Sequence, residues 1–360
     1  SVLEGTGQLG ADHSTVTVSG GASGEVSISA DAVILAAGSV PRVIPGFEVD
    51  DRQVVTSDEM LSIADLPRSA VVIGGGAIGL EFASMMSDLG SDVTIIEALP
   101  RILANCDDDI IRIVERSFKK RGIKVHAGVS VTGHTRTADG VTVTFGEGQE
   151  ATAETVVLSV GRRPNSATLG LEATSVSVDE RGFVEVDQTG RTSVDGVWAV
   201  GDLIDTPQLA HTGFAEGMLA ITDILGEDAM PIDYDRVPWC IYCHPEVAFA
   251  GLTEAQARER GYDVVVSKHR YAGNGRAMIV GETDGLVKII AERQPDGTGG
   301  RILGVHLAGP WVTEQLGQGY LAVNWEATVD EVAHFIQPHP TMSELFGESV
   351  LALTGRSLHG

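Results

Sequence analysis

Residues 70–97, AVVIGGGAIGLEFASMMSDLGSDVTIIE, decide the fold of the chain around them. The apolar run Ala70–Ile73 predicts a β-strand, and Gly74–Gly79 after it fits the pattern G-x-G-x-x-G. A helical stretch follows, and a second apolar strand, Val93–Ile96, ends on Glu97. Strand, glycine turn, helix, strand and acid in this order are typical of a βαβ unit that binds a dinucleotide. The sequence therefore predicts a Rossmann-like domain.

Three glycines and one acid of this stretch have separate expected roles. Gly74 permits the tight turn, Gly76 lets the backbone approach a pyrophosphate, and Gly79 lets the helix pack closely on the strand. The phosphates are expected at the N-terminus of the helix, where N–H groups are unpaired and the helix dipole is positive. Glu97 would accept hydrogen bonds from a ribose diol and repel a 2′-phosphate, so NAD is expected rather than NADP.

Two helices are expected in this domain. The first has apolar residues at helical spacing, which predict its buried face, and Gly90 marks its end. The second, Asp107–Arg121, has acids in its first turn, bases in its last turn and Gly122 after it, as the helix dipole favours. The residues expected to face the core are Phe82, Met85, Met86 and Leu89 in the first helix and Ile111, Val114 and Phe118 in the second.

Segments rich in β-structure are expected on both sides of this domain. Residues 1–44 alternate and then become apolar, and Asp139-Gly140 predicts a hairpin. From residue 236 the pattern indicates an antiparallel sheet, with a hairpin at Asp284-Gly285. Helices are expected near 253–260, 311–324 and 328–336, the last with a capping box of Thr328 and Glu331. The expected domains are residues 1–45, 46–166, 167–235 and 236–360.

The composition limits the class of partner. Acidic residues outnumber basic ones by 50 to 25, and the net charge of −25 argues against nucleic acid or an anionic membrane. No run of about 18 apolar residues occurs, so no membrane span is expected. Three cysteines make no disulfide framework, and the first residues lack the pattern of a signal peptide. A reducing, cytoplasmic location is therefore expected.

The cysteines and two of the histidines are interpreted as structural. Residues 240–244, CIYCH, match the haem-attachment pattern C-x-x-C-H, and their cysteines could be offered as a redox pair. Haem attachment needs an exported protein, so buried or half-buried thiols are preferred, and no metal site is expected because no second ligand pair has suitable spacing. Cys106 is interpreted as a surface or cap residue at a helix start. His306 and His334 lie in apolar sequence and are expected in the core.

Several stretches in their order resemble the flavoprotein disulfide reductases, and most closely the dihydrolipoyl dehydrogenase branch. The likeness covers essentially the whole chain. It implies an α/β fold in which a Rossmann-like NAD-binding domain is inserted in an FAD-domain remnant, followed by a C-terminal α+β dimerisation domain. The stretches are DAVILAAGSVPR (31–42), VVIGGGAIGLEFA (71–83), LSVGRRPN (158–165), GVWAVGDL (196–203), LAHTGFAEG (209–217), CHPEVAFAG (243–251) and HPTMSE (339–344).

The resemblance implies two cofactors, FAD and NAD. It places Ile78 and Glu81 near the nicotinamide, with Val131 and Gly161 forming the rest of that pocket. The full set implied for NAD is Gly74, Gly76, Ala77, Ile78, Gly79, Glu81, Glu97, Val131 and Gly161. The set implied for the flavin is Ala37, Gly38, Ser39, Asp202, Gln208, Leu209, Ala210 and His211, with Gly7 at the adenylate.

The resemblance also implies a catalytic pair, a histidine oriented by a glutamate five residues later, which matches His339 and Glu344. A dithiol must lose a proton before its sulfur can attack a disulfide, because the thiolate is the nucleophile. A histidine can take that proton near neutral pH, and a carboxylate fixes its tautomer and supports the imidazolium. In the family this histidine serves the disulfide of the other subunit.

Two motifs of the family, a second G-x-G-x-x-G in strand–turn–helix context and a Cys-x₄-Cys, are absent from these 360 residues. The family opens with a first G-x-G-x-x-G for the FAD pyrophosphate and a redox-active Cys-x₄-Cys beside the flavin. We therefore expect the C-terminal portion of such an enzyme, about 100 residues shorter than the whole, with FAD belonging to the parent protein. Such a chain is expected to be inactive by itself.

Three functions are compatible with these features. The first is a dihydrolipoyl dehydrogenase, homodimeric through residues 236–360, whose partner is the lipoyl-bearing subunit of 2-oxoacid dehydrogenase complexes. The second is a soluble pyridine nucleotide transhydrogenase, or another reductase of the family, which shares this architecture. The third is a flavin-free fragment that binds NAD or dimerises without catalysis.

Overall fold

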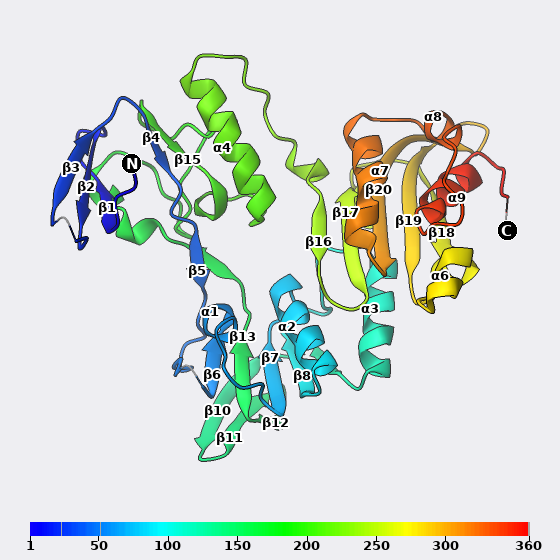
Figure 1. Cartoon of the computed structure of the whole chain (residues 1–360), viewed down its shortest axis with the longest axis horizontal. Coiled ribbons are helices and arrows are strands. Elements are labelled where there is room, and N and C mark those ends of the chain that lie inside the picture. The colour runs from blue at the N-terminus through cyan, green and yellow to red at the C-terminus, as the bar shows by residue number, and fades with distance from the viewer. Residues whose placement is uncertain (23, 51, 359–360) are drawn as a thin grey trace. The chain divides into compact units, whose positions relative to one another are not determined.

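The computed structural model describes residues 1–22, 24–50 and 52–358, and the chain forms two compact units (Figure 1). Unit 1 comprises Ser1–Arg42 and Arg162–Tyr234, and unit 2 comprises Val43–Gly161 and Asp235–Gly360. Unit 2 has a parallel-sheet half, residues 43–161, and an antiparallel-sheet half, residues 235–360. The four sequence domains, with boundaries after residues 45, 166 and 235, remain a prediction.

Unit 1 consists of small sheets and one long helix. Its first three strands form an antiparallel meander, and two further pairs of strands join residues from its two chain segments. Apolar side chains such as Leu35, Val197 and Leu203 are buried among these strands. The elements are β1 (Thr6–Leu9), β2 (Thr15–Ser19), β3 (Val26–Ser29), β4 (Val33–Leu35) with β15 (Val197–Ala199), β5 (Ser39–Pro41) with β14 (Arg162–Pro164), and α4 (Ala210–Ile224).

The parallel-sheet half of unit 2 is the expected Rossmann-like domain. Five parallel strands lie in the order β6-β13-β7-β8-β9, and a three-stranded antiparallel sheet, β10-β11-β12, accompanies them. The strands are β6 (Val54–Thr56), β7 (Ser69–Ile73), β8 (Asp92–Glu97), β9 (Lys124–Ala127), β10 (Val131–Thr137), β11 (Gly140–Phe145), β12 (Gln149–Ala153) and β13 (Thr155–Leu158). The helices are α1 (Ser57–Met60), α2 (Ala77–Asp88) and α3 (Asp108–Lys120).

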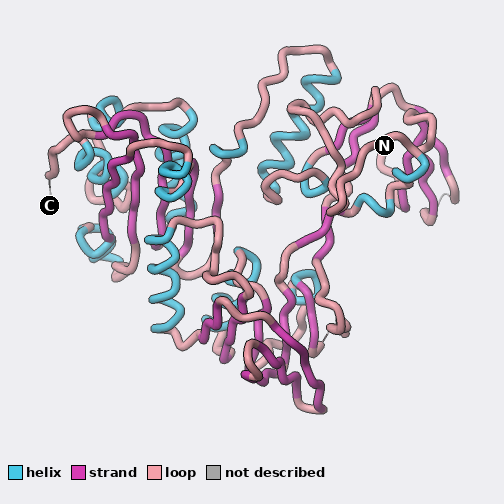
Figure 2. Tube along the Cα trace, turned by 180° about the vertical axis from the view of Figure 1, so that it is seen from behind, coloured by secondary structure: helices cyan, strands magenta, loops and turns pink. Residues whose placement is uncertain are grey.

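The antiparallel-sheet half has five strands in the order β16-β17-β20-β19-β18, and α7 and α9 lie against them (Figures 1 and 2). Alternate residues of the central strands belong to two cores. Val247 and Phe249 pack with α3 of the parallel-sheet half, whereas Ala248 and Ala250 pack with α7. The elements are β16 (Trp239–Ile241), β17 (Glu246–Gly251), α5 (Glu254–Glu259), β18 (Val264–Arg270), α6 (Gly275–Val280), β19 (Leu286–Arg293), β20 (Gly299–Gly309), α7 (Val312–Asn324), α8 (Val329–Ala333) and α9 (Glu344–Leu353).

Local signals located most of the helix ends correctly. α2 stops before Gly90, which has φ +105°, and α3 has Asp107 as its N-cap with Gly122 following its C-cap. The capping box of Thr328 and Glu331 is present at α8. These features depend on residues within one turn of each other, so the sequence carries them directly.

The predicted buried face of α2 was right at two of its four positions. Phe82 and Met86 are buried, but Met85 and Leu89 are 43% and 63% exposed. The buried face runs instead through Gly79, Phe82, Ala83 and Met86. At Gly79 an added Cβ would lie 2.1 Å from Gly74 O, so the helix approaches the glycine turn closely and turns this face to the sheet.

The hairpin predicted at Asp284-Gly285 was also wrong. The connection from β18 to β19 contains α6, and β19 begins only after Gly285. This glycine is needed for packing, since an added Cβ would lie 2.5 Å from the ring of Tyr271 and 2.6 Å from Ala308 O. Gly285 therefore allows two buried segments to approach closely and does not form the tight turn that the sequence predicts.

Two further interpretations need correction. Cys106 is buried, not a surface residue, and burial raises the pKa of its thiol to about 12. His334 is exposed at the end of α8, where its Nδ1–H donates to Asp330 O at 2.6 Å. His306 is fully buried, and Cys240 and Cys243 are half-buried and buried, as expected. Within the described residues no group of three or more metal-ligating side chains occurs.

Candidate functional site

The glycine turn between β7 and α2 has a geometry that only glycine permits. Gly74 has φ +114°, and an added Cβ there would lie 2.2 Å from Ser159 O. Gly76 is the N-cap of α2 and makes no side-chain cap hydrogen bond. No atom lies within 4 Å of the place where a Cβ of Gly76 would project. The turn therefore keeps one open side at the positive end of α2, where an anion is stabilised.

A cavity of about 500 Å³ opens at this turn within unit 2. It lies at the carboxyl ends of the parallel strands, where ligands bind in sheets of this type. The predicted NAD-binding residues that line it are Gly74, Gly76, Ala77, Glu97, Val131 and Gly161.

Ile78, Gly79 and Glu81 do not line this cavity. Ile78 packs against the core, and Glu81 Oε1 accepts a hydrogen bond from the N–H of Tyr242 at 2.8 Å. Burial raises the pKa of Glu81, and the hydrogen bond from Tyr242 offsets only part of this effect. The structure thus places Glu81 against the antiparallel-sheet half of unit 2.

Glu97 joins the glycine turn to the segment that follows β8. Its Oε2 accepts from the N–H of Gly75 at 2.5 Å, and its Oε1 accepts from the N–H of Leu99 at 2.6 Å. Each carboxylate oxygen can accept a further hydrogen bond. The acid is therefore held by the backbone at the edge of the cavity, in position to accept hydrogen bonds from a diol.

Sequence reasoning missed the aromatic wall of the cavity. Trp239, Ile241 and Phe249 line it from the antiparallel-sheet half. The rings of Trp239 and Phe249 stack at 5.7 Å between centroids, with planes 6° apart. These residues follow the glycine turn by more than 160 positions, so no local pattern relates them to it.

The residues of the cavity fit a dinucleotide such as NAD. The open side of Gly76 offers room for a phosphate, and the first turn of α2 supplies unpaired N–H donors. The hydroxyl of Ser159 is buried in the cavity lining without a hydrogen-bond partner. A polar ligand would satisfy this orphaned group, which would otherwise cost free energy.

A second polar group lies in unit 1, around Ser39 of β5. The hydroxyl of Ser39 donates to Asp202 Oδ2 at 2.6 Å, and Arg162 Nε donates to Ser39 Oγ at 2.6 Å. Arg162 also donates to the carbonyl of Ser39 at 2.8 Å. The structure thus brings together two of the predicted flavin-binding residues and adds an arginine that the sequence analysis had not singled out. Ala37 and Gly38 directly precede Ser39.

The segment that enters α4 carries unpartnered polar atoms. The buried atoms without a hydrogen-bond partner include Thr206 Oγ1, Gln208 Nε2 and Thr212 Oγ1. Of the other predicted residues here, Leu209 is the N-cap of α4, and Ala210 and His211 begin it. Orphaned donors and acceptors of this kind fit a polar ligand such as a flavin cofactor.

Gly7 is not linked to this group by hydrogen bonds among the described residues. It lies within β1 and pairs with Val18 of β2. Its contact with an adenylate stays a prediction.

His339 and Glu344 form the expected pair. The distance from His339 Nδ1 to Glu344 Oε1 is 2.8 Å, and Glu344 Oε2 accepts from the N–H of Thr341 at 2.7 Å. Glu344 is the first residue of α9 and its side chain is 18% exposed, whereas that of His339 is 75% exposed. Because Nδ1–H donates to the carboxylate, Nε2 carries the lone pair that can accept a proton.

Two family models match the chain. Residues 2–217 match the pyridine nucleotide-disulphide oxidoreductase model, and residues 237–350 match the dimerisation domain of the same group. The chain therefore belongs to the pyridine nucleotide-disulphide oxidoreductase family.

Its curated relatives include several dihydrolipoyl dehydrogenases. The enzyme of Bacillus subtilis is 42% identical over 332 residues, which cover 91% of this chain and 69% of the relative. The enzyme of Halobacterium salinarum is 36% identical over 364 residues, covering all of this chain and 76% of the relative. These relatives confirm the predicted closeness to dihydrolipoyl dehydrogenases and the class of NAD-dependent oxidoreductase.

Solved structures of this family share the fold. LpdA of Mycobacterium tuberculosis matches with a TM-score of 0.88 and 26% identity over 98% of this chain and 75% of that chain. The flavoprotein disulfide reductase RclA of Escherichia coli matches with a TM-score of 0.88 and 27% identity over 99% of this chain and 79% of that chain. The predicted fold class and the family's cofactors, FAD and NAD, are thereby confirmed. Among the described residues, no helix has both the length and the apolar character that a membrane crossing needs.

Proposed function

We propose that this chain provides the NAD site, the flavin-facing residues and the general base of a dihydrolipoyl dehydrogenase. The observation that carries the proposal is the cavity of about 500 Å³ at the glycine turn, bordered by Glu97. The substrate follows from the curated relatives, which are dihydrolipoyl dehydrogenases. When bound, FAD and NAD supply the two-electron chemistry of dithiol oxidation.

For NAD, we propose that the glycine turn and the first turn of α2 hold the pyrophosphate, because their N–H groups are unpaired. Glu97 accepts hydrogen bonds from the adenosine ribose and disfavours a 2′-phosphate. Ser159 supplies a hydroxyl to the same ligand, as its unpartnered buried oxygen suggests. Roles for Ile78 and Glu81 beside the nicotinamide rest on the family resemblance alone.

For the flavin, we propose a site around the Ser39–Asp202 hydrogen bond. Asp202 would accept from the ribityl hydroxyls, and Ala37, Gly38 and Ser39 would line the cofactor. The residues Gln208–His211 would run along it, with the orphaned amide of Gln208 satisfied by the ligand.

For proton transfer, we propose His339 as the base and Glu344 as its positioning partner. Glu344 holds Nδ1–H and leaves the exposed Nε2 to take the proton of a dithiol. The carboxylate also stabilises the imidazolium that results. The pair thus generates the thiolate that attacks a disulfide.

We propose a homodimer formed through the dimerisation domain, with the lipoyl-bearing subunit of a 2-oxoacid dehydrogenase complex as the partner. The dimerisation-domain match supports the first part, and the names of the relatives support the second. A cytoplasmic location is proposed with it, because the three free cysteines fit a reducing compartment.

The test begins with the 360-residue chain. Calorimetric titration should show micromolar binding of NADH and weaker binding of NADPH. Glu97→Gln should reduce the difference between these two affinities. Asp92→Asn, an exposed acid at the other end of β8, is the matched control. Absence of NADH binding, or equal affinity for NADPH, would contradict the proposed NAD site.

The substrate is tested in a chimaera. Because residues 1–360 contain no Cys-x₄-Cys motif, the part of the Bacillus subtilis relative that this chain does not match is joined to it. The chimaera should form NADH from NAD and dihydrolipoamide. Transfer of hydride between NADPH and NAD without dithiol oxidation would indicate a transhydrogenase instead.

A further inference from the structure

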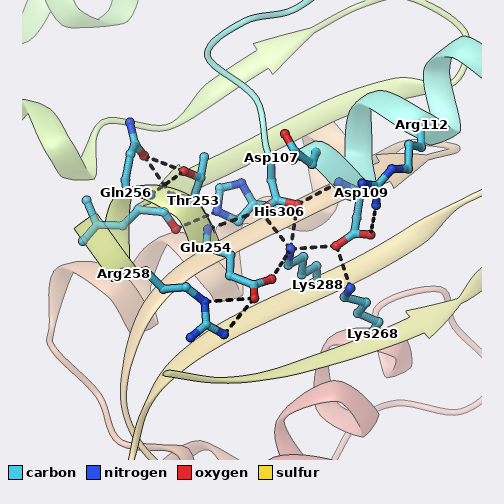
Figure 3. Close-up of polar contacts among 12 residues, drawn as sticks. Asp107, Asp109, Arg112, Thr253, Glu254, Gln256, Arg258, Lys268, Lys288 and His306 are labelled. Atoms are coloured by element: carbon cyan, nitrogen blue, oxygen red, sulfur yellow. Dashed lines mark hydrogen bonds and ion pairs between the residues drawn. The ribbon is translucent and has the colours of Figure 1, made fainter. Parts of the chain in front are cut away.

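Figure 3 shows a buried group of charged residues that the proposed function does not use. Lys288 of β19 is 1% exposed, and its Nζ contacts three carboxylates. The distances are 2.8 and 2.9 Å to the two oxygens of Asp107, 2.7 Å to Asp109 Oδ2 and 2.8 Å to Glu254 Oε2. At the edge of the group, Lys268 Nζ lies 2.7 Å from Asp109 Oδ2. We call these five residues the Lys288 cluster.

Asp107 is the centre of the cluster, because it bonds to both halves of unit 2. As the N-cap of α3, its Oδ1 accepts from the N–H of Asp109 at 3.0 Å. Its Oδ2 accepts from the N–H of Glu254, the first residue of α5, at 3.2 Å. One carboxylate therefore binds the start of a helix in each half, and Lys288 bridges its two oxygens.

The cluster stabilises charges that would be costly if left unpaired. Burial by itself would raise the pKa of Asp107, but the hydrogen bond from Lys288 and the charges around it bring that pKa below its usual range. Burial would likewise lower the pKa of Lys288, and the three carboxylates raise it instead. Loss of either partner would leave an uncompensated charge in the interior.

Asp107 directly follows the segment that lines one side of the NAD cavity. That segment, residues 99–106, contributes Leu99, Arg101, Leu103, Ala104, Asn105 and Cys106 to the lining. The N–H of Leu103 donates to Gly75 O at 2.8 Å, and the N–H of Cys106 donates to Leu103 O at 2.8 Å. The fully buried side chain of Ile102 packs on Gly75.

A continuous set of contacts thus runs from the glycine turn to the antiparallel-sheet half. Gly75 is bonded to Leu103, residues 103–106 form a tight turn, and Asp107 is held by Lys288. The segment 99–106 is therefore fixed at one end by Glu97 and the glycine turn, and at the other by the Lys288 cluster.

We propose that Lys288 is a positioning residue for NAD: by holding Asp107, it keeps residues 99–106 in place as a wall of the cofactor cavity. Lys288 does not line the cavity itself. The inference deepens the proposed function and rests on its NAD site. It makes the affinity of the Rossmann-like half for NAD dependent on a residue of the dimerisation domain.

The test compares Lys288→Met with Lys268→Met in the full chain. Both variants remove one positive charge from Asp109, but only the first releases Asp107. Lys288→Met should raise the dissociation constant for NADH about tenfold, because Lys288 is coupled through Asp107 to the segment 99–106. Lys268→Met should change it less than about twofold. Lys288→Arg, which keeps the charge, should restore most of the affinity.

Hydrogen–deuterium exchange distinguishes positioning from a merely structural role. In Lys288→Met, amides of residues 99–106 should exchange faster in the folded protein, while the β10–β12 sheet stays as in the parent chain. If Lys288→Met does not fold, Asp107→Asn with Lys288→Met removes both charges and keeps an N-cap, and the same two measurements apply.

Three outcomes overturn the inference. Unchanged NADH affinity and unchanged exchange at residues 99–106 in the folded variants would overturn it while the proposed NAD site stands. Equal weakening in Lys268→Met would show a general effect of charge. Failure of the parent chain to bind NADH would overturn the proposed NAD site and this inference together.

Discussion

Two pairs in unit 2, each of a basic side chain and a carboxylate, have similar distances and opposite surroundings. Lys288 Nζ lies 2.8 Å from Asp107, and His339 Nδ1 lies 2.8 Å from Glu344. The side chains of Lys288 and Asp107 are 2% and 3% exposed, whereas that of His339 is 75% exposed. The buried lysine has carboxylates around its whole ammonium group, while the histidine uses one nitrogen and leaves the other accessible.

The difference shows that a buried pair suits a structural role and an exposed pair suits a chemical one. A fully paired buried ion cannot exchange protons or reach a substrate, but its loss is costly because the partner remains desolvated. An exposed pair contributes little stability, because water competes for both charges. It keeps a titrating atom available for chemistry, which a base requires.

The largest effect expected is on stability at the buried pair. Asp107→Ala removes the ion pair with Lys288, the N-cap of α3 and the hydrogen bond to the N–H of Glu254, and should lower the free energy of unfolding by about 3–5 kcal/mol. His339→Ala should lower it by less than about 1 kcal/mol. Urea denaturation of the two variants measures both values. Equal losses of unfolding free energy in the two variants would contradict the contrast between the buried and the exposed pair.

For catalysis, the larger effect is expected at the exposed His339–Glu344 pair. In the chimaera described above, His339→Gln should reduce dihydrolipoamide oxidation at least about 100-fold, or about 2.7 kcal/mol in the barrier. NADH binding should not change, because His339 does not line the cavity. His334→Gln, another exposed histidine, is the matched control. A loss below about threefold for His339→Gln would rule out its role as the base.

The pH dependence of stability should report on the buried side chain of His306. His306 is fully buried, burial lowers its pKa, and Asp107 and Lys288 are the charged groups near it. Below pH 6.5 the unfolded chain therefore binds a proton that the folded chain does not. The free energy of unfolding should fall by about 1.4 kcal/mol per pH unit as the pH decreases through this range.

Denaturation between pH 7 and pH 4.5 measures this slope, and His306→Gln should flatten it. Asp109, whose pKa is about 2, adds a further loss as the pH falls from about 4 toward 2, because the unfolded chain then binds a proton that the folded Asp109 takes up only near pH 2. A slope unchanged by His306→Gln would contradict the prediction.

The smallest effect is expected at the rim of the buried cluster. Lys268 is 46% exposed, so Lys268→Met should lower the free energy of unfolding by less than about 1 kcal/mol. The difference from the parent chain should shrink in 1 M salt, which screens exposed charges. A loss of unfolding free energy as large as that of Asp107→Ala would show that water does not screen the charge of Lys268.

Local sequence was sufficient for most of the elements and for the glycine turn that opens on the cavity. The glycine turn, Glu97, the caps of α3 and α8, and the His339–Glu344 pair all depend on residues within a short stretch or on the family's motifs. Errors arose where packing overrides pattern. Met85 and Leu89 match a helical stripe but face away from the core, and Cys106 precedes a helix yet is buried beneath it.

By itself the sequence determined the Rossmann-like unit, because periodicity and turn chemistry act over a few residues. The order of its motifs indicated the family, and through it the pairing of His339 with Glu344. Only the tertiary structure decided that Trp239 and Phe249 wall the cofactor cavity and that Lys288 holds Asp107. Lys288 and Asp107 are 181 positions apart, and a lysine in an apolar strand gives no sign of its partner. Its cost of burial is offset in large part by Asp107 and Asp109, which come within reach only when the two halves of unit 2 pack together.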